Sequence, residues 1–211
     1  MSNLSTLLTL ADSRLPTGGH VHSGGVEEAV TCVLVVDLPT LRAYLRRRIR
    51  THGLVTASVA AAVHAGALSI SDADHETDAR TPAPAARQAS RGQGRGLVRL
   101  ARRVWPDHDW NLLGTTPHLA VAAGAVGAAS GLNPEQTALS VVYTTMTGSA
   151  TAAQRLLALD PGDVAALTFE LAPLCETTAA DAGKELADLS DPLLDVLAQQ
   201  HSQRERPLFV S

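Results

Sequence analysis

Hydrophobic side chains recur along this chain at intervals of three and four residues rather than at every second position. The clearest sets are Leu41, Leu45 and Ile49, then Leu97, Leu100 and Val104, then Leu186, Leu189 and Leu193. This spacing gathers apolar side chains on one face of a helix, whereas the strict alternation that indicates a half-exposed strand is not sustained anywhere in the sequence. The pattern therefore predicts an all-α protein.

Three prolines stand where a helix would begin. They are Pro134 after Asn133, Pro161 after Asp160 and Pro192 after Asp191. An Asn or Asp side chain can cap the free amide groups of a first helical turn, and proline is tolerated at the first helical position because its missing N–H would have no partner there. These dipeptides predict helices that begin at residues 134, 161 and 192.

Local composition qualifies this helical prediction in three segments. Residues 30–36 form a short segment of mostly β-branched residues. Such a segment fits either a strand or the buried end of a helix with poor intrinsic propensity. Residues 67–86 are rich in Ser, Asp, Thr and Pro, which predicts a surface connection with room for one short helix. Residues 117–158 are dominated by small side chains, which predicts a core of closely packed helices.

Length and composition point to one folded domain over residues 1–211. The chain has a mass of 22.0 kDa and is 45% hydrophobic, enough to bury one sizeable core. Its net charge of -4 and its aromatic content of 3% are not typical of nucleic-acid-binding domains, which carry basic surfaces and aromatic stacking residues. We therefore expect no nucleic-acid partner.

No feature of the sequence indicates secretion or a membrane. The two cysteines, Cys32 and Cys175, cannot form a disulfide framework or a four-thiolate zinc site. The first ten residues lack the basic start and the long apolar core of a signal peptide. The longest weakly polar stretch, residues 119–132, is too short and too rich in Ala and Gly to cross a bilayer. We expect a cytoplasmic protein with no membrane partner.

Charge is distributed unevenly along the chain. Residues 42–103 contain twelve arginines and four acidic residues, whereas residues 160–211 contain ten acidic residues and three basic ones. Five arginines spaced by four would form one basic stripe on a helix: Arg87, Arg91, Arg95, Arg99 and Arg103. Like charges at this spacing repel, so we expect compensation from the acidic C-terminal third or from solvent, or else from an acidic partner surface.

Motifs for catalysis are missing from the sequence. Residues 92–96, Gly-Gln-Gly-Arg-Gly, suggest a phosphate loop, but the Lys-Ser/Thr pair of a P-loop is absent, and a close helix crossing allowed by glycine is the simpler interpretation. There is no G-x-S-x-G nucleophile elbow and no H-E-x-x-H zinc helix. We expect no catalytic residue, no cofactor and no resident metal.

A glycine-rich N-terminal loop, residues 15–25, is the most distinctive segment. Its four glycines and one proline predict a backbone that turns tightly and lies against another surface. His20 and His22 would project to the same side of an extended loop, and imidazole suits nickel, zinc or copper. An exposed polar loop and a transient metal contact both remain open.

This region closely resembles the signature of the UreF family, the urease accessory proteins F. The matching residues are Leu8-Thr9-Leu10-Ala11-Asp12-Ser13-Arg14-Leu15-Pro16-Thr17-Gly18-Gly19-His20-Val21-His22-Ser23-Gly24-Gly25-Val26-Glu27. Further family-like stretches follow in order at residues 93–100, 118–124, 151–156 and 208–211, so the resemblance spans nearly the whole chain.

The chain departs from the family pattern at a few positions. His20 replaces an aromatic residue and Val21 a hydroxyl residue, while Val33 stands where relatives often have glycine, which puts the end of the first helix after the loop in question. Val210 replaces the arginine of the usual L-F-R-S tail, so any tail contact that used that charge must differ here.

The resemblance implies an all-α, non-catalytic accessory protein of about ten helices that works as a homodimer. Proteins of this kind are thought to bridge UreD (also called UreH) and the nickel-carrying GTPase UreG on the urease apoprotein, and to modulate GTP hydrolysis. The implied partner-binding residues are Pro16, Gly18, Gly19, Ser23, Gly25 and Glu27 in and after the loop, Arg155 in the A-A-x-R-L stretch, and Leu208 and Phe209 at an apolar tail end that would otherwise be exposed.

Two alternatives from other classes remain. One is a metallochaperone that binds nickel directly through His20 and His22. The other is a small hydrolase with a Ser-His-Asp triad that only folding could assemble.

Overall fold

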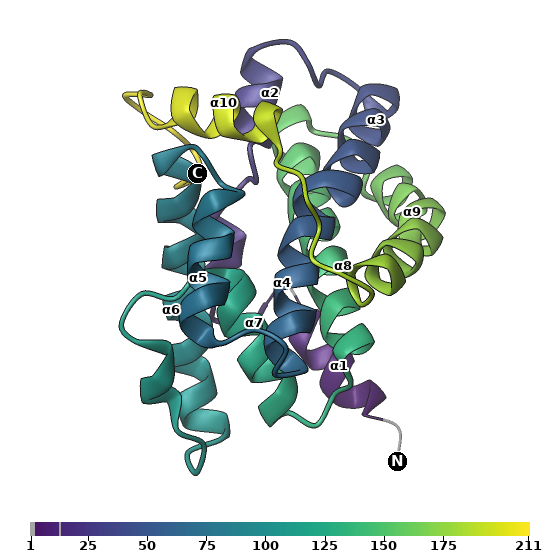
Figure 1. Cartoon of the computed structure of the whole chain (residues 1–211). Coiled ribbons are helices and arrows are strands. Elements are labelled where there is room, and N and C mark those ends of the chain that lie inside the picture. Colours follow the sequence, from purple (N-terminus) through teal and green to yellow (C-terminus); the bar gives the residue numbers. More distant parts are fainter. Residues whose placement is uncertain (1–2, 13) are drawn as a thin grey trace.

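The structure is a computed structural model that describes residues 3–12 and 14–211, and within these residues it contains ten α-helices and no strand (Figure 1). The helices are α1 (Leu4–Leu10), α2 (Val26–Thr31), α3 (Leu38–Arg48), α4 (Leu54–His64), α5 (Ile70–Ala79), α6 (Pro84–Val104), α7 (Leu119–Ala129), α8 (Pro134–Leu157), α9 (Pro161–Ala182) and α10 (Pro192–His201). Two 3-10 turns, η1 (Gly19–Val21) and η3 (Trp110–Leu113), and a π-helical turn, η2 (Ile49–Gly53), complete the elements. The all-α prediction is confirmed.

The three helix starts predicted from proline are confirmed. Pro134, Pro161 and Pro192 are the first residues of α8, α9 and α10. In each case the preceding side chain accepts hydrogen bonds from amides of the first turn, as Asn133 does from the Gln136 amide at 2.8 Å. The caps satisfy donors that have no partner inside the helix.

Helices α4 and α8 run through the middle of the molecule, with α9 on one flank and α5 and α6 on the other (Figure 1). Residues of α4 contribute to two hydrophobic clusters, one shared with α3, α8 and α9 and the other with α6 and α7. A Cβ atom on Gly124 of α7 would lie 2.5 Å from the carbonyl oxygen of Ala60 in α4, so only glycine allows this approach. The prediction of closely packed helices with small side chains is confirmed.

Residues 30–36 form neither a strand nor a buried helix end. Helix α2 ends at Thr31, and the amides of Leu34 and Val35 close the end by bonding to the carbonyl oxygen of Ala29. Only Val35 of the following residues is buried, whereas Val33, Leu34 and Val36 are exposed. The chain turns here because Val33 adopts a left-handed conformation, with φ of 60°.

Replacing Val33 with glycine is expected to stabilise the protein by about 1 kcal/mol. A β-branched residue is strained in the left-handed region, by an amount that exceeds the extra entropy that glycine loses on folding. The Val33 side chain is 73% exposed, so little apolar burial is lost. Urea unfolding measures the free energy of unfolding, which should rise in V33G and fall in the control Val196→Gly, an exposed position inside α10. An equal fall in both variants would contradict the expectation.

The segment 67–86 contains the one short helix that its composition allowed, α5, but its role is larger than that of a surface connection. Ala73 and Thr77 of α5 are buried, and Asp74 and Asp78 bind the basic stripe on α6. Arg91 lies 2.7 Å from Asp74 and 3.0 Å from Asp78. The compensating charge for this part of the stripe therefore comes from α5. This helix lies beside α6 because the connection between the two helices is short.

The acidic C-terminal third compensates other arginines instead. Arg42 pairs with Glu170 at 3.1 Å and Arg47 with Asp191 at 2.5 Å. Arg95, Arg99 and Arg103 are exposed and form no ion pair within the described part of the chain. Of the alternatives expected for the stripe, the C-terminal third supplies no ion pair to it within the described residues, and these three arginines face solvent.

None of the helices within residues 3–12 and 14–211 combines the length and the apolar character needed to cross a bilayer.

Candidate functional site

The N-terminal loop turns through glycines and lies against the body of the protein, as its composition predicts. Gly24 and Gly25 both have positive φ, at 66° and 85°. A Cβ atom on Gly25 would lie 2.9 Å from the Tyr44 hydroxyl, which itself donates a 2.9 Å hydrogen bond to the carbonyl oxygen of Gly24. Ser13, within the family-like segment, lies outside the described residues.

The glycines of residues 92–96 lie inside α6 rather than in a phosphate loop, and two of them admit backbone from elsewhere. A Cβ atom on Gly96 would overlap the carbonyl oxygen of Thr17 in the N-terminal loop. One on Gly94 would overlap the carbonyl oxygen of Pro117. The expected close approach is present, but the partners are connecting segments and not a crossing helix. The two glycine-rich motifs of the sequence therefore meet in space.

The C-terminal tail, residues 202–211, turns back after α10 and is held by Glu27 (Figure 1). The buried Glu27 carboxylate accepts hydrogen bonds from the amides of Leu208 at 2.8 Å and Phe209 at 3.0 Å. His201 of α10 lies 2.8 Å from the same carboxylate. Burial alone would raise the pKa of Glu27, but these bonds outweigh it and hold the pKa below its usual value. Glu27 thus remains ionised and ties the tail to α2.

Main-chain bonds join the tail directly to the N-terminal loop. The Val210 amide donates to the carbonyl oxygen of Val21 at 2.7 Å, and the Ser23 amide donates to that of Ser211 at 2.5 Å. His22 Nδ1 lies 2.6 Å from the Ser211 hydroxyl. The loop and the tail therefore form one unit, although 189 positions separate His22 from Ser211 in the sequence.

The sequence-derived partner-binding residues divide into exposed and buried groups. Pro16, Arg155 and Leu208 are exposed, Gly18 and Gly19 are half-buried, and Ser23, Gly25, Glu27 and Phe209 are buried. Arg155 lies over the Phe209 ring, with its guanidinium carbon 5.4 Å from the ring centroid. The expectation of an exposed apolar tail end holds for Leu208 but is wrong for Phe209, because Glu27 draws the Phe209 backbone inward.

Sequence reasoning missed the residues of α10 and the tail that support this unit. His201 bonds to Glu27, and Arg204 lies 3.0 Å from Glu28 and 2.6 Å from the Thr31 hydroxyl. These partners are more than 170 positions apart, so no local pattern could have linked them. The surplus of acids at Glu27 and Glu28 was the only available signal.

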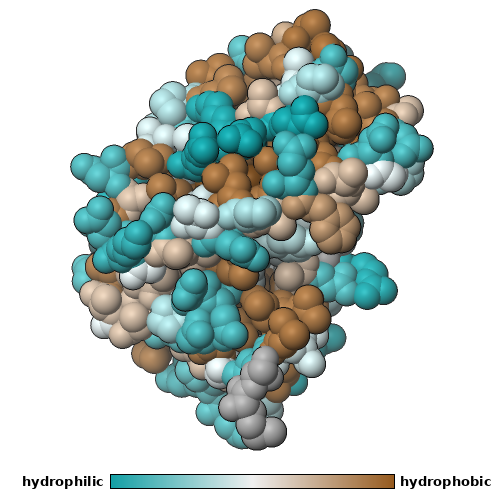
Figure 2. Space-filling view, turned by 90° about the vertical axis from the view of Figure 1, so that its right-hand side faces the viewer, coloured by the Kyte–Doolittle hydropathy of each residue, from teal (hydrophilic) through white to brown (hydrophobic). Residues whose placement is uncertain are grey.

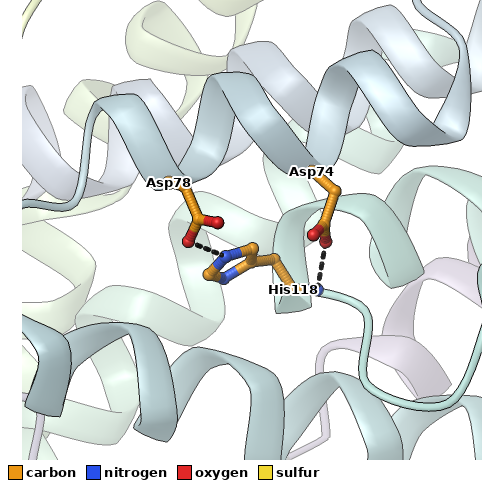
Figure 3. Close-up of side chains that lie close together, drawn as sticks. All are labelled: Asp74, Asp78 and His118. Atoms are coloured by element: carbon orange, nitrogen blue, oxygen red, sulfur yellow. Dashed lines mark hydrogen bonds and ion pairs between the residues drawn. The ribbon is translucent and has the colours of Figure 1, made fainter.

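A second cluster joins α5, α6 and the start of α7 around His118 (Figure 3). His118 is fully buried, with Nε2 2.8 Å from Asp78 and Nδ1 2.9 Å from the Ser90 hydroxyl. Asp74 accepts a bond from the His118 amide at 3.2 Å. Burial lowers the pKa of His118, and the bond to Asp78 opposes this only in part.

The His118 cluster has the composition of a catalytic triad and of a metal site, but its contacts are those of a structural network. The Ser90 hydroxyl also accepts the Leu119 amide at 3.2 Å, which fixes the first turn of α7. Asp74, Asp78 and His118 each offer one ligand atom within 4.8 Å of the others. The guanidinium of Arg91 already occupies the position of a cation, because it binds both carboxylates. The cluster therefore positions α5 and α7 against α6.

The loop histidines lie apart from this cluster. His20 is exposed, and His22 is bonded to the tail. Burial, with the nearby His20 as a smaller cause, lowers the pKa of His22. In residues 3–12 and 14–211, the only group of three potential ligands close enough to share an ion excludes both histidines.

A family model described as UreF matches residues 35–172. The urease accessory protein UreF of Mycobacterium sp. (strain JLS) is 78% identical over 211 residues, which cover 100% of both chains. The proteins of the same name from Mycolicibacterium vanbaalenii and Mycobacterium tuberculosis (strain H37Ra) are 78% and 69% identical, again over 100% of both chains.

Proposed function

The chain belongs to the UreF family of urease accessory proteins, and from this premise we propose that it holds UreD (UreH) and the GTPase UreG in fixed geometry on the urease apoprotein and modulates GTP hydrolysis by UreG. The protein takes part in urease maturation and is not itself an enzyme. Its role is therefore carried by surfaces that other proteins recognise.

The anchored tail is the observation that supports this proposal most directly. Glu27 and the N-terminal loop hold the backbone of residues 208–211, while Leu208 and Val210 remain exposed and Arg155 lies over the Phe209 ring. An apolar side chain on a backbone that is already ordered gains affinity, because little conformational entropy is lost on binding. We assign this surface to UreD.

The exposed half of the basic stripe supplies a surface of different character. Arg95, Arg99 and Arg103 point away from α6 without an acidic neighbour within the described residues. Long-range attraction to an acidic surface would speed association and orient the partner. We assign this surface to UreG. UreD and UreG would then bind to different surfaces of the protein.

Replacing Leu208 with serine is expected to weaken UreD binding about tenfold to a hundredfold, because burying a leucine contributes about 1.5–3 kcal/mol. Leu208 is 79% exposed in the isolated chain, so the substitution should not change the free energy of unfolding of the protein. Binding is measured by surface plasmon resonance with purified UreD. The matched control is Leu112→Ser, which removes a similarly exposed leucine from η3. Equal affinities for L208S and the unaltered protein would contradict the assignment.

A homodimer is part of the same proposal. Figure 2 looks onto the side of the molecule that carries α9 and shows hydrophobic residues interrupting the polar surface in several places. Phe169 on α9 and Leu4 and Leu8 on α1 are exposed. Apolar side chains of this size on a surface are typical of protein contacts, which supports a second copy of the chain as the partner on this side.

A further inference from the structure

Arg48, the last residue of α3, is a buried cation that forms no ion pair in the described part of the chain. It is only 7% exposed, and its Nε and Nη1 atoms have no hydrogen-bond acceptor within the described part of the chain. Nor does any carboxylate there lie within ion-pair distance of it. A buried guanidinium normally binds carboxylates or carbonyl groups, because removing its charge from water costs several kcal/mol.

The neighbouring groups do not supply the missing negative charge. Asp191 is occupied by Arg47 at 2.5 Å and by the Thr51 hydroxyl at 2.8 Å. Burial, and then the charge of Arg48, lowers the pKa of His52 to about 3, so this imidazole is neutral at pH 7. Burial raises the pKa of Tyr44, which keeps its phenol protonated. Arg48 therefore has no ion-pair partner of its own in the described part of the chain, and the charge of Asp191, which also acts on His52 and Tyr44, is already paired with Arg47.

A cavity borders this charge. Its volume is about 290 Å³, and its lining includes Arg48, His52, Gly24 and Ser149. Three acidic residues, Asp12, Asp191 and Asp195, also line it. The Ser149 hydroxyl is also buried without a hydrogen-bond partner. A Cβ atom on Gly24 would lie 2.6 Å from Arg48 Nη2 and 2.8 Å from Ser149 Oγ, so both polar groups converge on the space beside this glycine. The guanidinium and the hydroxyl thus both pack against Gly24, and any other residue at this position would displace them.

The local backbone also sets this position apart. Arg48 immediately precedes η2, a π-helical turn that interrupts the otherwise continuous helix from α3 to α4. Such turns cost hydrogen-bond geometry and occur frequently at functional sites. Here the turn contains His52, which lines the same cavity.

We propose that the Arg48 cavity is a binding site for a small oxyanion, of the phosphate or carboxylate class, held by the Arg48 guanidinium and the Ser149 hydroxyl. A planar guanidinium presents parallel N–H donors that match two oxygens of such an anion, and a hydroxyl adds a third bond. A bound anion would neutralise the buried charge and satisfy the unpaired donors. Neither proposed ligand, Arg48 or Ser149, belongs to the tail or to the basic stripe, although Phe209 and Ser211 of the tail also line the cavity.

The test measures anion binding to the full-length purified protein in chloride buffer at constant ionic strength. Inorganic phosphate and acetate are titrated separately by calorimetry, and Tm is followed at each concentration. We expect saturable binding of at least one of the two anions, with a rise in Tm. Phosphate binding identifies a tetrahedral oxyanion as the preferred ligand, and acetate binding identifies a carboxylate.

Three variants test the residues that carry the proposal. Arg48→Met should weaken anion binding about tenfold to hundredfold while raising Tm in chloride alone, because it removes an unpaired buried charge. Ser149→Ala should weaken binding about three- to tenfold without loss of stability. The control Arg99→Met removes an exposed arginine and should leave the affinity unchanged.

Two outcomes would overturn the site. One is the absence of saturable binding of either anion to the unaltered protein. The other is equal anion affinity in S149A, R48M and the unaltered protein, which would place any binding elsewhere. If R48M fails to fold, the S149A comparison decides alone, because that variant removes only a hydroxyl that has no partner in the chain.

Discussion

Replacing Glu27 with alanine is expected to lower the free energy of unfolding by about 3–5 kcal/mol, because each buried donor left without an acceptor costs about 1–3 kcal/mol. The change would leave His201 and the amides of Leu208 and Phe209 without the carboxylate that they share. The tail would then lose its anchor to α2. We therefore expect faster hydrogen exchange at residues 207–211 together with the loss of stability.

Urea unfolding and hydrogen exchange measured on the same samples check this expectation. Glu27→Gln should lose less stability than the alanine variant, because the amide oxygen of glutamine can still accept one or two of the three hydrogen bonds. Glu185→Ala, which removes an exposed glutamate, is the matched control and should stay within about 0.5 kcal/mol of the unaltered protein. An E27A variant as stable as this control would show that the tail contributes nothing to the fold.

Acid is expected to destabilise the protein well before the carboxylates titrate. Burial lowers the pKa of His22, His52, His64 and His118 in the folded state, and that of His52 falls to about 3. The unfolded chain, with histidine pKa values near 6.5, then binds more protons than the folded chain as the pH falls. The stability due to these groups is complete above about pH 6.5 and is lost progressively below it.

The expected slope is up to about 1.4 kcal/mol per pH unit for each such histidine. Glu27, Asp78 and Asp191 have lowered pKa values, so their contribution is present above about pH 4 and is lost below it, in the same direction. Burial raises the pKa of Asp195, so the folded chain binds this proton more readily than the unfolded chain does. Asp195 therefore opposes the loss of stability at the pH where it titrates. The histidine effect should therefore dominate between pH 6.5 and 5.

Urea unfolding at pH 7, 6 and 5 measures this slope. His52→Gln should flatten the curve by about one histidine's share, since the variant has no group to protonate at that position. The control His75→Gln removes an exposed histidine of α5 and should leave the slope as it is. Stability that does not change between pH 7 and 5 would contradict the burial of these imidazoles in neutral form.

The helices were predictable because their signals are local. An Asn or Asp before proline caps a first turn by itself, so the starts of α8, α9 and α10 follow from three dipeptides. The family-like segment likewise lies within twenty consecutive residues. Residues 30–36 were ambiguous because β-branched residues fit a strand or a helix end equally, and the left-handed Val33 depends on how α2 is closed.

The sites could not be predicted in the same way. The basic stripe was visible in the sequence, but its acidic partners were sought in the C-terminal third, whereas α5 supplies Asp74 and Asp78. Phe209 looked like an exposed tail end, and only the carboxylate of Glu27 explains its burial. Ion pairs of this kind form between any opposite charges that packing brings within about 4 Å, and sequence distance does not restrict them.

By itself, the sequence determined that this is a helical accessory protein of the UreF family without a catalytic motif, and it identified the glycines at which backbone must come close. Only the tertiary structure decided what comes close: Thr17 against Gly96, the tail against Glu27, and Arg48 in a place where no acid among the described residues pairs with it. The physical reason is that backbone preferences act over a few neighbouring residues, whereas the partner of a buried charge is chosen by the packing of helices far apart in the chain.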